Sequence, residues 1–270
     1  MKILKNVSDL KKAINGVSGL GFVPTMGGIH NGHISLIKKS QKKCNKTIIS
    51  IYVNPKQFNK NKDFNNYPRK LDEDLKILKK LRVNYVFLPD TYEIYKKKRV
   101  NKIKLVSNDK ILCAKFRKGH FEGVLDVVDR FIKIINPKYI FLGEKDFQQL
   151  FLIKKFIKKK YKTKVILCKT VRDNNFIALS TRNNLLSEED LTIASSIAKK
   201  LNYTKKLLLK KNKFKIKISE IKKEIIKTFK IKIDYLEIRN ISNLKNFSNK
   251  NKFKIFIAYY IKNIRLIDNF

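Results

Sequence analysis

The sequence has no tryptophan, only two methionines, three histidines, five prolines and nine glycines in 270 residues. No apolar run approaches the roughly 20 residues that a membrane-spanning helix needs, and residues 1–6 lack the apolar core of a secretory signal. The three cysteines (Cys44, Cys113 and Cys168) lie far apart and without metal-ligand spacing. Because an odd number of scattered cysteines is typical of reduced thiols, we expect a cytoplasmic protein without a cysteine metal site.

Acidic residues are also scarce, since 22 Asp and Glu stand against 63 Lys and Arg, giving a net charge of +41. That excess would bind phosphate-rich polymers at low salt, so a basic nucleic-acid-binding protein is one alternative. However, the basic residues are spread through almost every segment, and the aromatic residues form no stacking motif. Lys, Asn, Ile, Phe and Tyr have A/T-rich codons, so their abundance favours mutational bias. We expect neither a nucleic-acid nor a membrane partner.

The apolar pattern predicts an α/β fold, a Rossmann-like parallel sheet with helices on both faces, followed by a smaller C-terminal α+β lid domain. Short apolar runs predict strands at residues 3–4, 20–23, 47–53, 85–88, 103–106, 139–142 and 165–168. Helical spacing separates them, at about residues 8–14, 33–45, 71–81 and 127–135. We expect a first domain at 1–172 and the lid at 173–270, with strands near 233–238 and 253–258.

Residues 21–35 form a strand, a glycine-rich turn and a helix start. We expect Pro24 and the Gly27–Gly28 pair to stop the strand, because proline cannot donate to a ladder and glycine readily takes positive φ. His30 and His33 then lie at the helix mouth. The unpaired N–H groups and dipole of such a mouth favour an anion, most simply a phosphate.

This stretch concentrates residues that the chain otherwise avoids. Two of the three histidines and four of the nine glycines fall here. A plain structural turn whose histidines only cap the helix is the alternative, but packing alone does not explain the concentration. We therefore interpret the turn as a phosphate-handling site.

Two further polar segments follow strands at the carboxyl ends expected to meet at one sheet edge. Gln57 follows the third strand, as a neutral amide that could face a substrate. Lys145, after the strand at 139–142, could supply a point charge for phosphate, with Asp146 accepting from ribose hydroxyls and Gln149 facing the substrate. In residues 177–183, the hydroxyls of Ser180 and Thr181 and the fork of Arg182 could close over a triphosphate. Ser187 opens a predicted capping box.

Several strings in this order resemble the pantoate–β-alanine ligase (pantothenate synthetase) family, a branch of the His-x-Gly-His nucleotidylyltransferase superfamily. They are Pro-Thr-Met-Gly with His-Asn-Gly-His, Asn-Pro-Lys-Gln-Phe, Gly-Glu-Lys-Asp-Phe-Gln-Gln and Ser-Thr-Arg-Asn, and the resemblance spans about residues 21–269. It implies ATP-dependent condensation of (R)-pantoate with β-alanine to pantothenate through a pantoyl adenylate, releasing AMP and pyrophosphate. It also implies Mg²⁺ and a homodimer.

The resemblance assigns roles to individual positions. His33, His30 and Lys145 are expected to be catalytic, with His33 donating a proton toward the departing pyrophosphate. Gln57 and Gln149 are expected to bind pantoate and β-alanine, and no residue is expected to be a metal ligand. The expected ATP-binding positions are Met26, Gly27, Gly28, Ile29, His30, Asn31, Gly32, His33, Gly143, Glu144, Lys145, Asp146, Val171, Leu179, Ser180, Thr181 and Arg182.

The sequence also departs from the family at four positions. Thr181 stands where the family has serine, Phe176 where it has glycine, Lys118 where it has proline and Asp126 where it has threonine. Three alternatives therefore stay open: another nucleotidylyltransferase of the superfamily, a decayed enzyme, and the basic nucleic-acid-binding protein named above.

Overall fold

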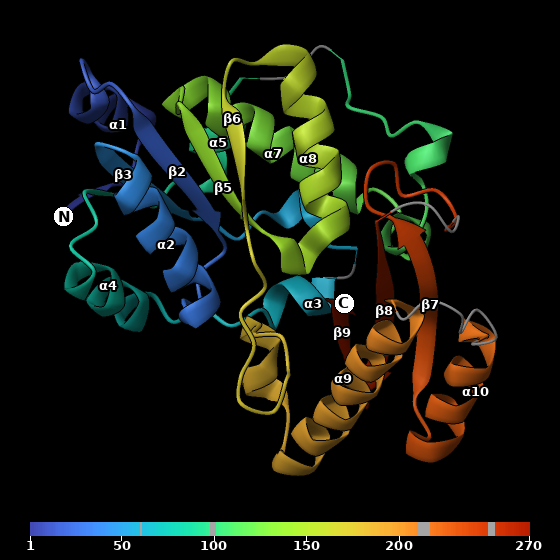
Figure 1. Ribbon diagram of the computed structural model, residues 1–270. Helices are drawn as coiled ribbons and strands as arrows, with labels where there is room; N and C mark the ends of the chain where they lie inside the picture. The colour runs from blue at the N-terminus through green and yellow to red at the C-terminus, as the bar shows by residue number, and fades with distance from the viewer. Residues whose placement is uncertain (60, 98–100, 210–216, 248–251) are drawn as a thin grey trace. The chain divides into compact units, whose positions relative to one another are not determined.

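The computed structural model describes residues 1–59, 61–97, 101–209, 217–247 and 252–270 (Figure 1). The chain divides into two compact units, Met1–Lys169 and Thr170–Phe270. This division falls close to the boundary expected after residue 172. Each unit has its own sheet and its own buried apolar residues, and each is described separately below.

The first unit contains a six-stranded parallel sheet in the order β1-β4-β3-β2-β5-β6. Its strands are β1 (Lys2–Leu4), β2 (Leu20–Thr25), β3 (Lys46–Ile51), β4 (Tyr85–Phe87), β5 (Tyr139–Gly143) and β6 (Lys164–Cys168). From β2 the chain moves outward to β3 and β4, and from β5 it moves outward to β6 on the other side. The strand order therefore reverses between β2 and β5, the place where open α/β sheets form ligand crevices at the carboxyl ends of their strands.

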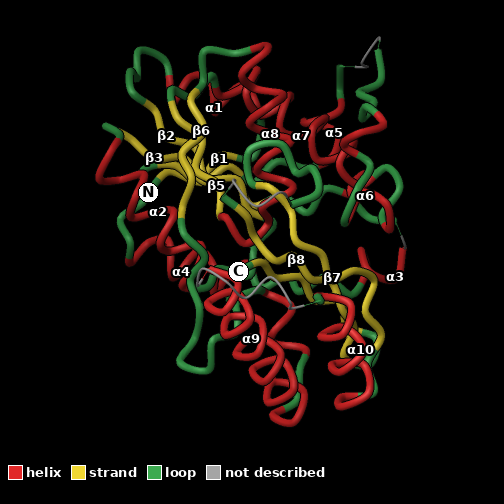
Figure 2. Tube along the Cα trace, turned by 45° about the vertical axis from the view of Figure 1, so that its right-hand side comes forward, coloured by secondary structure: helices red, strands yellow, loops and turns green. Residues whose placement is uncertain are grey.

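Helices cover both faces of this sheet, as the sequence predicted (Figures 1 and 2). Helices α2 and α4 lie on one face, while α1, α7 and α8 gather on the other. Their bounds are α1 (Val7–Ile14), α2 (Asn31–Lys43), α4 (Leu71–Lys80), α7 (His120–Ile135) and α8 (Phe147–Lys160). Short helical segments connect them: η1 (Pro55–Gln57), α3 (Asn61–Asn65), α5 (Thr91–Tyr95), η2 (Ser107–Asp109), α6 (Cys113–Phe116) and η3 (Glu144–Asp146).

The alternation along β2 shows why both faces must be covered. Phe22 and Val23 are adjacent and both fully buried. The Phe22 ring packs 5.4 Å from that of Phe131 on α7, whereas Val23 belongs to the apolar cluster that contains Ile37 of α2. Successive side chains of a strand point to opposite faces, so a continuous apolar run such as residues 20–23 marks a strand buried on both sides.

Pro24 does not stop β2, which runs on to Thr25, so that prediction was wrong. The Thr25 carbonyl accepts from the N–H of Tyr52, on the β3 side. Pro24, one residue earlier, faces the β5 side, where the pairing ends at Phe22 and Ile140. A proline costs no ladder bond at a place where the neighbouring strand has already diverged.

The strand predicted at residues 103–106 is also wrong. These residues lie in an irregular segment between the short α5 and η2, with no strand assigned among them. The segment is rich in lysine, and residues 102, 104 and 106 are exposed while residue 105 is buried. The short alternation of apolar and polar residues there resembles that of a half-buried strand. The described residues do not pair this segment with a neighbouring strand.

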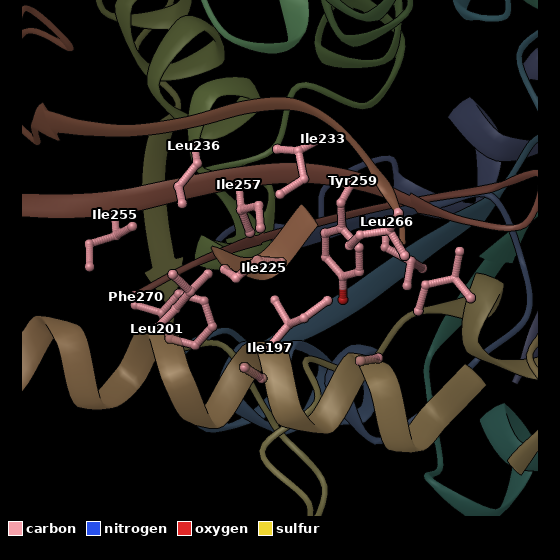
Figure 3. Packing of buried hydrophobic residues seen from close by; sticks show 14 of the residues in the cluster. Ile197, Leu201, Ile225, Ile233, Leu236, Ile255, Ile257, Tyr259, Leu266 and Phe270 are labelled. Atoms are coloured by element: carbon pink, nitrogen blue, oxygen red, sulfur yellow. The ribbon is translucent and has the colours of Figure 1, made fainter. Parts of the chain in front are cut away.

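The second unit is a three-stranded antiparallel sheet packed against helices. Its elements are η4 (Thr181–Leu185), α9 (Glu188–Leu209), α10 (Ile218–Phe229), β7 (Lys232–Asn240), β8 (Phe253–Ile261) and β9 (Ile264–Asn269), with sheet order β7-β8-β9. Ile197 and Leu201 of α9 face Ile257 and Leu236 of the sheet across an apolar layer (Figure 3). The predicted α+β composition is confirmed, although β9 was not predicted as a strand.

The predicted capping box at Ser187 is confirmed. Ser187 Oγ accepts from the N–H of Asp190 at 3.3 Å, and Asp190 Oδ2 accepts from the N–H of Ser187 at 3.1 Å. Two backbone donors that α9 cannot satisfy internally are paired in this way, which fixes where the helix begins.

The two ends of the second unit are joined by Arg172. Its guanidinium donates to both carboxylate oxygens of Asp268 on β9, at 2.7 and 2.9 Å, and lies 4.5 Å from the centre of the Phe270 ring. A two-point bond of this kind fixes orientation as well as distance.

Among the described residues, no helix is long and apolar enough to span a membrane.

Candidate active site

The turn between β2 and α2 needs glycine at position 27. Gly27 has φ 85° and Gly28 has φ 63°, in the left-handed region that side chains disfavour. A Cβ on Gly27 would lie 3.0 Å from Asp74 Oδ2 and 3.2 Å from Ile51 Cγ2. Conformation and lack of space therefore both select glycine there.

His30 and His33 together cap α2. His30 is the N-cap residue, and its Nδ1 accepts from the N–H of Gly32 at 3.1 Å. The N–H of His30 donates in turn to Nδ1 of His33 at 3.4 Å. Because each Nδ1 accepts, the hydrogen-bond pattern assigns the neutral tautomer with its proton on Nε2.

Both imidazoles are held neutral near pH 7. Burial, followed by the charge of Lys145, lowers the pKa of His30 to about 4. Burial, followed by His30 and Lys145, lowers the pKa of His33 to about 3, while Asp146 opposes both shifts. The site therefore offers neutral N–H groups from the two rings.

The helix mouth offers fewer unpaired amides than the sequence predicted. The N–H groups of Gly28 and Ile29 donate to the two carboxylate oxygens of Asp74, at 2.9 and 2.6 Å. The N–H of Gly32 donates to His30. The expected row of unpaired donors for phosphate is thus largely used within the protein, and the side chains carry more of the site's chemistry.

The loop after β5 lies next to this turn, because β2 and β5 are neighbours in the sheet. Gly143 ends β5, and Glu144, Lys145 and Asp146 form η3. Lys145 Nζ is 3.3 Å from Asp146 Oδ1, and its side chain is 19% exposed. The charges of Lys145 and Asp146 act on both imidazoles. The structure thus brings the pair His30 and His33 close to the pair Lys145 and Asp146, although at least 112 positions of sequence separate the two pairs.

Gln57 faces the same glycine turn from η1. Its Nε2 lies 2.6 Å from the sulfur of Met26, and its Oε1 accepts from Asn54 Nδ2 at 3.4 Å. Asn54 is 1% exposed, and Tyr95 Oη also donates to it at 2.9 Å. The Gln57 amide is therefore oriented by neighbours on both sides.

His120 and Arg117 support the backbone of Gln57, a role that the sequence analysis did not identify. His120 is 8% exposed, and its Nδ1 lies 2.7 Å from the Gln57 carbonyl oxygen. Arg117 Nη1 lies 3.0 Å from His120 Nε2, and Arg117 Nη2 donates to the same carbonyl at 3.3 Å. Since Arg117 can only donate, His120 accepts at Nε2 and carries its proton on Nδ1. The sequence does contain a feature that points to His120, because it is the third of only three histidines.

Gln148 and Gln149 are neighbours on α8 with different surroundings. Gln148 is 6% exposed and donates to the Ile111 carbonyl at 2.7 Å, so it holds the fold. Gln149 is half-buried. The Gln149 amide has no hydrogen-bond partner within the described part of the chain, which suits the expected substrate contact better than Gln148 does.

The remaining expected ATP-binding positions lie together in the second unit. The N–H of Leu179 donates to the Val171 carbonyl at 3.0 Å, closing a narrow loop. Ser180 caps η4 by accepting from the N–H of Arg182 at 3.3 Å, and Thr181 is buried.

Three departures from the family pattern fit this structure. Phe176 adopts φ 68°, the left-handed conformation expected of the glycine it replaces. Asp126 pairs with Arg130 at 3.1 Å along α7, and Lys118 is exposed beside Gly119. None of the three removes an element of the site.

Comparisons with known proteins show the family to which the chain belongs. The family model described as pantoate-beta-alanine ligase matches residues 2–270. Pantothenate synthetase from Fervidobacterium nodosum is 36% identical to the chain, covering 100% of it and 98% of that protein. The one from Clostridium acetobutylicum is 39% identical, covering 100% and 99%. The chain belongs to the pantoate–β-alanine ligase family. It is a ligase whose reaction forms pantothenate.

Solved structures of the family share the fold over its whole length. Pantothenate synthetase from Thermus thermophilus is 28% identical, with a TM-score of 0.88, covering 100% of this chain and 99% of that one. A pantoate-beta-alanine ligase from Francisella tularensis, complexed with beta-gamma ATP and beta-alanine, is 36% identical, with a TM-score of 0.85, covering 100% and 97%. The predicted Rossmann-like class with a smaller C-terminal α+β part is thereby confirmed.

Proposed function

We propose that pantothenate forms in two displacements at the carboxyl ends of β2 and β5. The carboxylate of (R)-pantoate attacks the α-phosphorus of ATP, and pyrophosphate leaves with the electrons of the broken P–O bond. The amine of β-alanine then attacks the acyl carbon of the pantoyl adenylate, loses a proton, and AMP leaves. The observation that carries this proposal is the cluster of His30, His33 and Lys145 at the reversal point of the strand order. Binding of ATP is supported by the relative complexed with beta-gamma ATP.

In this proposal the protein supplies position and charge and forms no covalent bond to the substrates. Lys145 places a positive charge against the phosphates, and the Nε2–H groups of His30 and His33 donate to their oxygens. The resemblance assigned proton donation to His33. In the ligand-free protein a ring with a pKa of about 3 is neutral at pH 7, so in this proposal His33 donates a hydrogen bond to the phosphates from its Nε2–H.

The carboxylate substrate is assigned to neutral amides. Gln57 and Gln149 can orient pantoate without adding a negative charge that would repel it. The family resemblance implies four segments that bind ATP, and we assign them accordingly: the glycine turn around Met26, residues 143–146, Val171 and residues 179–182. Ser180, Thr181 and Arg182 are assigned as further donors for the triphosphate.

Mg²⁺ is proposed to enter with ATP. Within the described ranges, no group of three or more His, Cys, Asp or Glu side chains could hold a metal ion. In this proposal the ion is bound mainly through the phosphates, with water completing its shell. When bound, Mg²⁺ would neutralise part of the charge on the transferring group.

Three further expectations complete the proposal. Residues 173–270 act as a lid that excludes water from the acyl adenylate, which water would otherwise hydrolyse. The chain is a homodimer, and it works in the cytoplasm.

The test is AMP formation from ATP, Mg²⁺ and D-pantoate, with and without β-alanine. Multiple turnovers of AMP that require β-alanine, with pantothenate as the product, are expected. Nucleotide transfer to another acceptor would favour a different nucleotidylyltransferase. Salt-sensitive nucleic-acid binding without ATP turnover would contradict the proposal.

A further inference from the structure

Asp74 connects helix α4 to the glycine turn of the site. It lies in the first turn of α4 and is 2% exposed, while its sequence neighbours Asp72 and Glu73 are exposed. A carboxylate in the first turn of a helix is stabilised by the helix dipole. This favourable position alone does not explain why one of three consecutive acids is buried.

The explanation lies in what the carboxylate binds. Oδ1 accepts from the N–H of Ile29 at 2.6 Å and Oδ2 from the N–H of Gly28 at 2.9 Å. Oδ2 also lies 3.0 Å from where a Cβ of Gly27 would stand. The two oxygens thus hold Gly28 and Ile29 by hydrogen bonds, and Oδ2 leaves no room for a side chain on Gly27.

The turn leads directly to the catalytic pair. Ile29 is the last residue before His30, the N-cap of α2, and its side chain is buried in the cluster that Ile34 of α2 also packs against. An apolar residue before the N-cap and another at the fourth helical position fix the direction in which a chain enters a helix. Asp74 fixes the backbone just before that point, so both contacts set the orientation of His30.

We infer that Asp74 is a positioning residue of the ligase site, holding the backbone of Gly28 and Ile29 so that the His30 and His33 rings face the phosphates. It does so through the turn and touches no substrate. The inference rests on the proposed function in one respect, because the roles of the two rings belong to that proposal. The backbone link itself stands independently.

This role also explains why the amides at the helix mouth are occupied. Two donors that could have bound phosphate instead hold a carboxylate whose charge they stabilise. Burial raises the Asp74 pKa, and the bonds from Ile29 and Gly28 oppose that shift. The ionised form accepts from both amides, whereas a neutral carboxyl or amide can accept fully at only one oxygen.

The first experiment compares Asp74→Asn with Asp72→Asn, which changes an exposed acid in the same helical turn. Asp74→Asn keeps the size and one acceptor, but it points an NH₂ group at an N–H. We expect the KM for ATP to rise about 10-fold or more in Asp74→Asn, on the scale of a misplaced catalytic group. Asp72→Asn should match the wild type.

The second readout does not depend on turnover. The chain has only three histidines, so imidazole ¹H–¹⁵N spectra of the ligand-free protein are simple. Asp74→Asn should shift the His30 and His33 signals and leave His120 unchanged. If the wild type proved inactive, the proposed function would fail, while these spectra would still test the position of the rings.

A third variant covers the possibility that Asp74→Asn changes more than the turn. Gly27→Ala strains the same turn from the other side, so its effect on the KM for ATP should be less than additive with that of Asp74→Asn. Unchanged ring signals and KM in Asp74→Asn would overturn the inference. So would additive effects in the double variant, or failure of Asp74→Asn to fold, because Asp74 would then support the unit as a whole.

Discussion

The imidazole ring of His30 lies 4.1 Å from that of His33, centre to centre, with 37° between their planes. The two rings are also joined through the backbone, since the N–H of His30 donates to His33 Nδ1. Two imidazolium ions at this distance would repel each other, and each ring lies near Lys145. The arrangement therefore selects the neutral form of both rings and leaves the Nε2–H of each as a donor.

We predict a specific pH dependence of stability from this pair. The pKa of each ring falls from 6.5 in a model compound to about 4 for His30 and about 3 for His33. Between those values and 6.5 the unfolded chain binds more protons than the folded one, so the free energy of unfolding falls as the pH is lowered through this window. Because both side chains are partly exposed, we expect the pair to contribute about 1–3 kcal/mol to this loss between pH 7 and pH 4.

Urea unfolding at pH 7, 6, 5 and 4 checks this prediction. The variant is His30→Asn with His33→Asn, because asparagine keeps an acceptor near the Nδ1 position and is a good N-cap residue that does not titrate. Its free energy of unfolding should fall less steeply than that of the wild type below pH 6.5. Parallel curves for the two proteins would contradict the pKa values of the pair.

A second prediction concerns the charge beside the rings. Lys145→Ala removes a fixed positive charge from the place assigned to the phosphates, so pyrophosphate release from ATP and pantoate should fall by about 100-fold or more. The same change should raise the pKa of His30 and His33, because Lys145 lowers both. Lys154→Ala, which changes an exposed lysine of α8, is the matched control and should be neutral. A wild-type rate in Lys145→Ala would remove Lys145 from the mechanism.

A third prediction separates the two nitrogens of His120. Asparagine places its amide nitrogen near histidine Nδ1, whereas glutamine places it near Nε2. The Nδ1 of His120 lies 2.7 Å from the Gln57 carbonyl, so His120→Asn should retain that bond and His120→Gln should lose it. We expect the KM for pantoate to rise about 10-fold in His120→Gln, the loss of one positioned bond of about 1.4 kcal/mol. Equal KM values for the two variants would show that His120 only fills space.

Part of this site could be predicted from the sequence, because its residues follow directly from strand ends. Short buried strands are recognisable from apolar runs, and parallel strands place their carboxyl ends at one edge. His30, His33 and Lys145 each come soon after such an end, at β2 or β5. Their proximity in space therefore followed from the fold class alone.

Other parts depend on contacts that no local pattern carries. Asp74 lies in a run of three acids, and only the packing of α4 against the turn distinguishes it from Asp72. The same contact pairs the amides of Gly28 and Ile29 with a carboxylate. The predicted anion site therefore counted more unpaired N–H groups than the structure offers. Pro24 remains within β2 because β5 has already turned away from it, which is a property of the sheet and not of the proline.

The last prediction concerns the left-handed residue Phe176. It has φ 68°, its side chain is 44% exposed, and its N–H donates to the Asp173 carbonyl at 3.1 Å, so the turn is formed despite the side chain. A residue with a Cβ pays about 1–2 kcal/mol in this conformation, and glycine avoids that cost while adding about 0.5–1 kcal/mol of chain entropy to lose on folding.

Phe176→Gly should therefore be as stable as the wild type or more stable by up to about 1 kcal/mol. Phe176→Ala keeps the Cβ and the strain, so it should be less stable than Phe176→Gly by about 1 kcal/mol. Urea unfolding of the three proteins measures both differences. Equal stability of the glycine and alanine variants would mean that the turn carries no strain at this position, and that the replacement of the family's glycine by Phe176 had no conformational cost.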